Sequence, residues 1–255
     1  MNNCYAGQAL AGILSLGRGC FVLGRAVCYF VGMGRLKPVP DLSLEDALWC
    51  AGARVVAGVD EAGRGALAGP VVAAAVVVPA HDVSAGVWGR VRDSKLLTAS
   101  IRAELEVEIQ QAAQAWAVGV SSAAEVDEAG VARATRLAMA RAIEELAPRP
   151  DYLLIDWVRL PQLNIAQTSL PKADQRSVSV AAASILAKVH RDRLLVALHG
   201  DYPDYGFASN KGYGAPQHLA AIERLGPCPQ HRLSFAPLAQ RPTLFDADAP
   251  SGGAP

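Results

Sequence analysis

The sequence has no excess of charge of either sign, because its 255 residues include 24 Lys and Arg and 24 Asp and Glu. Net charge therefore does not attract the protein to a polyanion, and any binding to nucleic acid must come from a local basic patch. Hydrophobic residues make up 51% of the chain. A chain of this length and composition can bury one full core, so we expect one main domain with short extensions.

Neither cysteine nor histidine shows the spacing of a metal site or a disulfide framework. No CxxC pair occurs and the number of cysteines is odd, so the pattern favours neither a zinc ribbon nor a disulfide-rich fold, and a reducing, cytoplasmic location fits it best. The cysteines are Cys4, Cys20, Cys28, Cys50 and Cys228, and the histidines are His81, His190, His199, His218 and His231.

The amino-terminal segment lacks the features of a signal peptide or a membrane span. A signal peptide needs positive charge before its apolar stretch, but the leader at 1–11 has none, and Arg18 and Arg25 interrupt the apolar run. A central Arg25 would cost a spanning helix about 2.5–3.5 kcal/mol. We expect no membrane association, and we interpret residues 1–53 as a leader that is disordered or translated from a mis-assigned start. A non-standard targeting segment is the alternative.

From residue 54 onward, apolar runs alternate with segments of helical spacing. This alternation predicts an α/β fold. The expected strands are 54–60, 70–78, 115–120 and 152–156, and the expected helices are 98–113, 131–146, 178–198 and a short one at 217–225. The end of the chain, residues 239–255, is rich in Pro, Ala and Asp, and we expect it to be a flexible tail.

Four carboxylates lie at the ends of predicted strands or ahead of a predicted helix. Asp60 and Glu61 end an apolar run and lead into a turn at Gly63, Asp156 ends a second run, and Asp174 precedes the last long helix. Consecutive strand residues point to opposite faces, so Asp60 and Glu61 can serve one site only if the strand ends there and the backbone turns. We therefore expect the strand to end at this pair, and the carboxylates to converge beyond the carboxyl edge of the sheet.

Such a cluster would require cations. Mutual repulsion would raise the pKa of some of the carboxylates, and sites made only of oxygen ligands select Mg²⁺ or Mn²⁺. Two such ions could activate water and stabilise the leaving 3′-oxygen in the hydrolysis of a phosphodiester. For Asp156 or Asp174 alone, a turn or helix-cap role is the simpler interpretation.

The order of several motifs between residue 54 and about residue 237 resembles the ribonuclease HII family, the type 2 ribonucleases H. The motifs are GVDEAGRG at 58–65, GP at 69–70, DSK at 93–95, LLID ending at Asp156, KADQRSVSVAAASILAKVHRD at 172–192, YGFASNKGYG from Tyr205 and HRLSF from His231. The resemblance implies a catalytic domain over 54–238 with a ribonuclease H-like fold, which is a mixed five-stranded sheet flanked by helices with a C-terminal helical segment. It also implies that Asp60, Glu61, Asp156 and Asp174 are catalytic and hold two Mn²⁺ or Mg²⁺ ions.

The resemblance further implies a substrate and the residues that contact it. The family hydrolyses the RNA strand of RNA/DNA hybrids and nicks duplex DNA 5′ to an embedded ribonucleotide, leaving 5′-phosphate and 3′-hydroxyl ends. Its GRG backbone meets the ribose 2′-hydroxyl, and its KGY tyrosine packs on the next sugar. Glycine allows a close approach, and an aromatic face suits a deoxyribose. The expected substrate-binding residues are Gly63, Arg64, Gly65, Lys95, Lys211 and Tyr213.

Two positions bear on how closely the chain follows the family. Trp157 stands where the family usually has glycine after the strand-end aspartate, and it is expected either to narrow the cleft or to pack on the neighbouring loop. The GRG sequence favours the type 2 enzymes, because the related type 3 enzymes carry a different sequence there.

Other function classes fit the sequence less well. Residues 63–68 match G-x-G-x-x-A after a strand, but a strand follows where a nucleotide-binding fold requires a helix. A non-enzymatic duplex-binding module is disfavoured because carboxylates repel phosphates unless a metal intervenes. The sequence QRPTLF at 240–245 loosely resembles peptides that dock on bacterial sliding clamps, although a disordered tail is the simpler interpretation. We expect a monomer.

Overall fold

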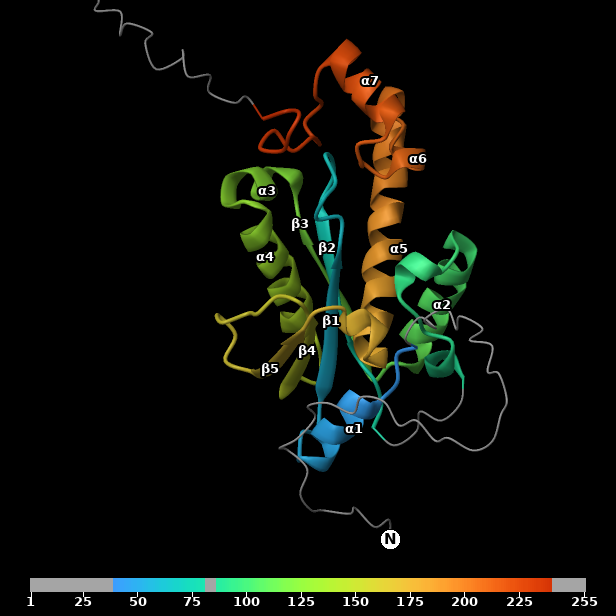
Figure 1. The fold of residues 1–255 in the computed structure, drawn as a ribbon, viewed down its shortest axis with the longest axis vertical. Helices are drawn as coiled ribbons and strands as arrows, with labels where there is room; N and C mark the ends of the chain where they lie inside the picture. Colours follow the sequence, from blue (N-terminus) through green and yellow to red (C-terminus); the bar gives the residue numbers. More distant parts are fainter. Residues whose placement is uncertain (1–38, 81–85, 240–255) are drawn as a thin grey trace, which may run out of the picture. The chain divides into compact units, whose positions relative to one another are not determined.

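The computed structural model of the protein describes residues 39–80 and 86–239, and these contain one mixed five-stranded sheet (Figure 1). The strand order is β3-β2-β1-β4-β5. Strand β1 pairs antiparallel with β2 and parallel with β4; β2–β3 is antiparallel and β4–β5 is parallel. The strands are β1 (Val56–Ala62), β2 (Val71–Val77), β3 (Ala115–Ser121), β4 (Tyr152–Asp156) and β5 (Ala166–Leu170). The expected mixed five-stranded sheet is confirmed.

Helices cover both faces of this sheet, with α5 on one face against β1 and β2 and α4 on the other against β2 and β3 (Figure 1). The helices are α1 (Ser43–Cys50), α2 (Ala99–Ala112), α3 (Ala123–Ala129), α4 (Val131–Glu144), α5 (Val178–Asp201), α6 (Phe207–Asn210) and α7 (Pro216–Leu225). Short 3₁₀ turns lie at Val87–Gly89, Ser94–Leu96, Ala173–Gln175 and Pro203–Tyr205. The predicted α/β class is confirmed. Among the described residues, no helix has the length and apolar character needed to cross a membrane.

Close packing of α5 on β1 explains one glycine of the GVDEAGRG motif. A Cβ on Gly58 would lie 2.2 Å from the backbone carbon of Ser179 and 2.3 Å from the nitrogen of Val180. Only glycine allows the first turn of α5 to approach the strand this closely. The contact places the start of α5 beside Gly58, two residues before Asp60 on β1.

The structure extends further toward the amino terminus than the predicted catalytic domain. Helix α1 lies inside the expected leader of residues 1–53, and the side chain of its Glu45 is fully buried. Glu45 Oε1 accepts hydrogen bonds from Ser177 Oγ at 2.6 Å and from the backbone nitrogen of Ser179 at 2.9 Å. At least residues 41–50 therefore belong to the folded unit. Residues 1–38 and 240–255 lie outside the described residues.

Two buried histidines form a hydrogen-bonded pair in the C-terminal helical segment. Their Nε2 atoms are 3.0 Å apart. His231 Nδ1 accepts from the backbone nitrogen of Cys228 at 2.9 Å, and His218 Nδ1 lies 2.8 Å from the carbonyl oxygen of Tyr213. These partners are satisfied when both rings are neutral, His218 donating to Tyr213 and His231 donating to His218. Burial, followed by the charge of His218, lowers the pKa of His231 to about 4.

This pair should make the protein sensitive to mild acid. Between pH 6.5 and about 4, the unfolded chain protonates His231 and the folded chain does not, so the free energy of unfolding should fall as the pH falls through this window. The loss should be at most about 3 kcal/mol and should stop below pH 4. Urea unfolding at pH 7, 5 and 4 measures it. His231→Gln should flatten this dependence, whereas the control His199→Gln should keep it; equal slopes in both would contradict the assignment.

Candidate active site

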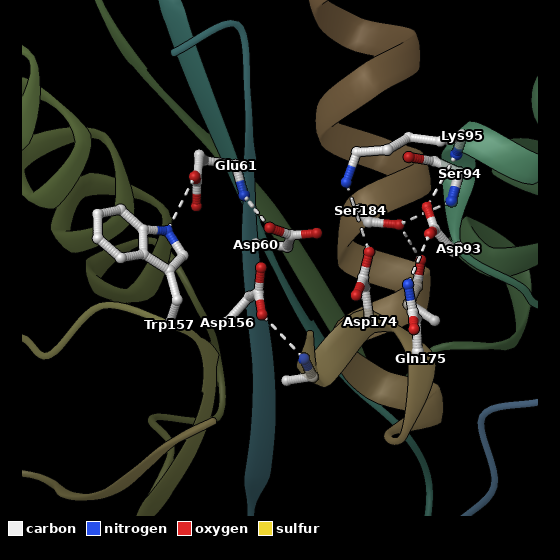
Figure 2. A network of polar contacts seen from close by, with 12 residues as sticks. Asp60, Glu61, Asp93, Ser94, Lys95, Asp156, Trp157, Asp174, Gln175 and Ser184 are labelled. Atoms are coloured by element: carbon white, nitrogen blue, oxygen red, sulfur yellow. Dashed lines mark hydrogen bonds and ion pairs between the residues drawn. The ribbon is translucent and has the colours of Figure 1, made fainter. Parts of the chain in front are cut away.

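The carboxyl ends of β1 and β4 carry acidic residues side by side. These strands are parallel neighbours with Val59 opposite Ile155, so Asp60 and Asp156 follow at the same level. Asp174 reaches the same region from the 3₁₀ turn before α5, and Figure 2 shows the three aspartates around one space. Asp156 Oδ1 accepts from the backbone nitrogen of Ala173 at 2.8 Å, which joins this turn to β4.

Strand β1 does not end at Asp60 and Glu61, so this expectation from the sequence is wrong. It continues to Ala62, because β2 pairs with it beyond this point, with Asp60 opposite Ala74 and Glu61 opposite Ala73. The two carboxylates therefore leave opposite faces of the strand. Asp60 faces Asp156 and Asp174, whereas Glu61 turns toward Trp157 (Figure 2).

Glu61 is held by donors on its own side of the strand. Trp157 Nε1 donates to Glu61 Oε1 at 3.1 Å, and Arg64 Nη1 lies 3.7 Å from the same oxygen. The other oxygen, Oε2, is buried and has no hydrogen-bond partner. A buried carboxylate oxygen without a donor is costly, which indicates that a cation or another donor belongs beside it.

Burial and mutual repulsion destabilise the charged forms of all four carboxylates. Burial raises the pKa of Asp60 well above its ordinary value, and the charges of Glu61 and Asp156 raise it further. Burial likewise raises the pKa of Glu61, Asp156 and Asp174, and for Asp174 repulsion by Asp93 adds to it. Lys95 Nζ, 3.6 Å from Asp174 Oδ2, is a cation that offsets part of this repulsion.

The donor set has the chemistry of a site for a hard divalent cation. All four side chains offer oxygen, the ligand type that Mg²⁺ and Mn²⁺ prefer. As placed, however, no three Asp, Glu, His or Cys side chains in residues 39–80 and 86–239 form a ready metal-binding group. The chemistry of these donors fits such an ion, and the buried Oε2 of Glu61 is one carboxylate oxygen that still lacks a partner.

A pocket of about 250 Å³ joins this cluster to most of the expected substrate-binding residues. It is lined by Asp60, Glu61, Ala62, Gly63, Arg64, Gly65, Ser94, Lys95, Asp156, Lys188 and Tyr213. Lys211 lies apart and lines a separate hollow between α2 and α5. Ser94 and Lys188 also line the pocket, and neither is among the substrate-binding residues that the resemblance implies.

The GRG loop is shaped by a buried arginine. Gly63 has φ +91°, and a Cβ there would lie 1.9 Å from Arg191 Nε. Arg191 is fully buried and donates to the carbonyl oxygens of Ala68, Pro70 and Lys211, which ties the loop to the KGY segment. A Cβ on Gly65 would meet nothing within 4 Å. Packing therefore requires glycine at 63, whereas glycine at 65 leaves the pocket open.

Trp157 packs on this loop, as the simpler of its two sequence interpretations expects. The Arg64 guanidinium lies 3.8 Å from the centre of the Trp157 ring, a cation–π contact. Trp157 has φ +46°, a left-handed conformation that costs an ordinary residue about 1–2 kcal/mol. Trp157 is 40% exposed, and it contacts the pocket residues Glu61 and Arg64.

A mixed five-stranded sheet with clustered carboxylates at the carboxyl ends of two adjacent parallel strands defines a ribonuclease H-like nuclease. The family model "Ribonuclease HII" matches residues 57–238. A ribonuclease HII of Synechococcus sp. (strain JA-3-3Ab) is 50% identical over 209 residues, which cover 81% of this chain and 94% of that relative.

Two solved structures agree with the fold. The ribonuclease H2 of Pyrococcus horikoshii OT3 superposes with a TM-score of 0.61 at 26% identity, covering 72% of this chain and 95% of that one. The ribonuclease HII from a complex with PCNA of Archaeoglobus fulgidus also superposes with a TM-score of 0.61. The two chains are 27% identical, and the match covers 75% of this chain and 99% of that one. The chain belongs to the ribonuclease HII family. It is therefore a metal-dependent ribonuclease H, a hydrolase that acts on RNA in RNA/DNA hybrids.

Proposed function

We propose that the enzyme, besides cutting RNA in hybrids, nicks duplex DNA on the 5′ side of an embedded ribonucleotide and leaves 5′-phosphate and 3′-hydroxyl ends. One observation carries the proposal: three of the four carboxylates, the GRG loop and Tyr213 come from distant parts of the chain and line one pocket, and the fourth carboxylate, Asp174, lies beside its Lys95. A pocket of this composition can hold a phosphodiester beside a group that distinguishes ribose from deoxyribose.

We propose that Asp60, Glu61, Asp156 and Asp174 hold two Mg²⁺ or Mn²⁺ ions during catalysis. Such ions would activate the attacking water and stabilise the leaving 3′-oxygen. The four carboxylates would orient the scissile phosphate through this binding, and their burial would keep competing water from the reacting atoms.

The residues around the carboxylates would select the substrate. The backbone of Gly63, Arg64 and Gly65 would meet the ribose 2′-hydroxyl, where the open space at Gly65 permits a close approach. Tyr213, 39% exposed, would pack on the sugar of the next nucleotide. Its ring faces the buried Arg191 guanidinium at 5.3 Å, which limits its movement. Lys211 would contact the duplex outside this pocket.

Cleavage of a DNA duplex carrying one ribonucleotide tests the proposal. With Mg²⁺ or Mn²⁺ the enzyme should nick 5′ to the ribonucleotide, and with chelator it should not. An all-DNA duplex and a long RNA/DNA hybrid are the companion substrates. Cutting of the long hybrid alone would contradict the single-ribonucleotide activity while leaving the ribonuclease H assignment intact.

Lys95 is expected to bind a substrate phosphate. Its side chain is 79% exposed and lies at the pocket beside Asp174. Lys95→Ala should raise KM about 3- to 10-fold and reduce the salt dependence of binding by about one counterion. The control is Arg54→Ala, which removes the same charge at the opposite end of β1. Equal KM values in both variants would exclude a phosphate contact by Lys95.

The structure of the Archaeoglobus fulgidus relative is of a complex with PCNA. We propose that this chain binds a sliding clamp through Gln240–Phe245, which lie outside the described residues, and that it works as a cytoplasmic monomer. A peptide of residues 236–250 should bind a bacterial clamp in a fluorescence-anisotropy titration. Absence of binding would contradict the proposal that the tail binds a sliding clamp.

A further inference from the structure

Trp157 is a residue at the active site whose role the proposed chemistry leaves open. It directly follows Asp156 and holds the left-handed backbone conformation φ +46°, which favours glycine. Strained residues of this kind persist where the surrounding structure holds them, and they cluster at functional sites. The strain alone shows no function, so the contacts of the indole decide what it does.

The indole makes two different contacts with its two chemical parts. Its N–H donates to Glu61 Oε1 at 3.1 Å, and its ring face carries the Arg64 guanidinium at 3.8 Å. The first contact reaches a carboxylate of β1, and the second reaches the GRG loop. One side chain directly after β4 therefore contacts two segments that line the pocket, and Figure 2 shows its contact with Glu61.

The side chain of Glu61 accepts a hydrogen bond from outside β1, from Trp157, because it leaves the strand on the face where Trp157 lies. Since β1 continues to Ala62, the side chain of Glu61 leaves the face of the strand opposite to that of Asp60, although both residues line the same pocket. Trp157 binds Oε1 and leaves Oε2 buried without a partner. This is the arrangement of a ligand fixed through one oxygen with the other available to a metal.

We propose that Trp157 is a positioning residue that orients Glu61 for metal binding and at the same time holds Arg64 over the pocket. The proposal rests on the proposed role of Glu61 as a metal-binding carboxylate. Hydrogen-bond donors behind metal ligands typically change metal affinity 10- to 100-fold. Loss of an exposed cation–π contact changes binding about 2- to 5-fold. The indole N–H is therefore expected to affect mainly the affinity for the metal. The indole ring is expected to affect mainly the position of Arg64 in the GRG loop, and so the binding of substrate.

Two substitutions separate these effects. Trp157→Phe keeps an aromatic face and removes the N–H, so Mn²⁺ should bind about 10- to 100-fold more weakly to the nucleic-acid-free enzyme while KM stays near wild type. Trp157→Gly removes both contacts, so KM should also rise about 2- to 5-fold. Because glycine accepts φ +46° without strain, the melting temperature of this variant should not fall. Electron paramagnetic resonance of free Mn²⁺ measures the affinity without turnover.

Two controls make the result decisive. Trp116 on β3 is also 40% exposed, and Trp116→Phe should leave Mn²⁺ affinity unchanged. Glu61→Gln should weaken Mn²⁺ binding if the proposed metal site is right. Weak binding in Glu61→Gln with normal binding in Trp157→Phe would overturn the role of Trp157 alone, and normal binding in Glu61→Gln would overturn the assignment of Glu61 and the inference with it. A lower melting temperature in both Trp157 variants would show a structural role instead.

Discussion

Asp60→Asn should abolish cleavage and yet make the metal-free protein more stable. The carboxylate is buried beside Glu61 and Asp156, and both charges oppose its ionisation. Asparagine keeps Oδ1, which accepts from the backbone nitrogen of Glu61 at 2.7 Å, and removes the charge. Relief of a buried repulsion of about 1–3 kcal/mol should raise the melting temperature by roughly 3–10 °C.

The activity of the same variant should fall at least about 10³-fold. A metal ion contributes several kcal/mol of transition-state stabilisation, and each 1.36 kcal/mol is a factor of ten in rate. Mn²⁺ should raise the melting temperature of the wild type and have a much smaller effect on Asp60→Asn, because a ligand stabilises only the state that binds it. Scanning fluorimetry with Mn²⁺ and with chelator measures both effects.

The exposed Asp46→Asn is the matched control, and it should change neither stability nor the response to Mn²⁺. Loss of stability in metal-free Asp60→Asn would mean that the aspartate is stabilised by a partner inside the protein. Asp60 would then be structural, and the carboxylate cluster would need another explanation.

The sequence predicts which residues form the site better than it predicts how they reach it. The ends of apolar runs correctly indicate that Asp60 and Asp156 lie near the carboxyl ends of neighbouring strands, since β1 and β4 pair in parallel. The continuation of β1 past Glu61 depends on its pairing with β2, which no local pattern in β1 reveals. The Trp157–Glu61 contact joins residues 96 apart in sequence and follows from that pairing, so it could be found only in three dimensions.

Elements with weak local signals were also missed. Strand β5 (Ala166–Leu170) reads AQTSL, which is neither apolar nor alternating, and it forms because β4 offers it a parallel edge. Helix α3 was missed as well, although its capping box of Ser122 and Glu125 is a signal that the sequence contains.

Lys211 lies in a family motif, but the left-handed backbone at this residue and its hydrogen bond to Ala208 O direct its side chain away from the pocket.

The largest loss of stability is expected from a residue outside the active site, Glu45 of α1. Its Oε1 accepts hydrogen bonds from Ser177 Oγ, from the backbone nitrogen of Ser179 and from Ser179 Oγ, at 2.6–2.9 Å, and all three residues are fully buried. Glu45→Ala would leave two of these three donors without an acceptor, because one serine hydroxyl can still donate to the other at 3.0 Å. Each unsatisfied group costs about 1–3 kcal/mol, so the free energy of unfolding should fall by about 3–5 kcal/mol.

This loss should reach the active site as well, because Ser177 caps α5 directly after the turn that holds Asp174. Urea unfolding should therefore show a lower midpoint for Glu45→Ala, and cleavage assays a lower kcat at saturating metal. Glu45→Gln keeps the accepting oxygen and changes only the oxygen that has no partner, so it should stay within about 1 kcal/mol of wild type. Asp46→Ala, one position on and exposed, should cost no more than about 0.5 kcal/mol. If Glu45→Ala lowered the free energy of unfolding no more than Asp46→Ala does, α1 would not contribute to the stability of the domain. The buried hydrogen bonds of Glu45 indicate instead that α1 is part of the fold that positions Asp174.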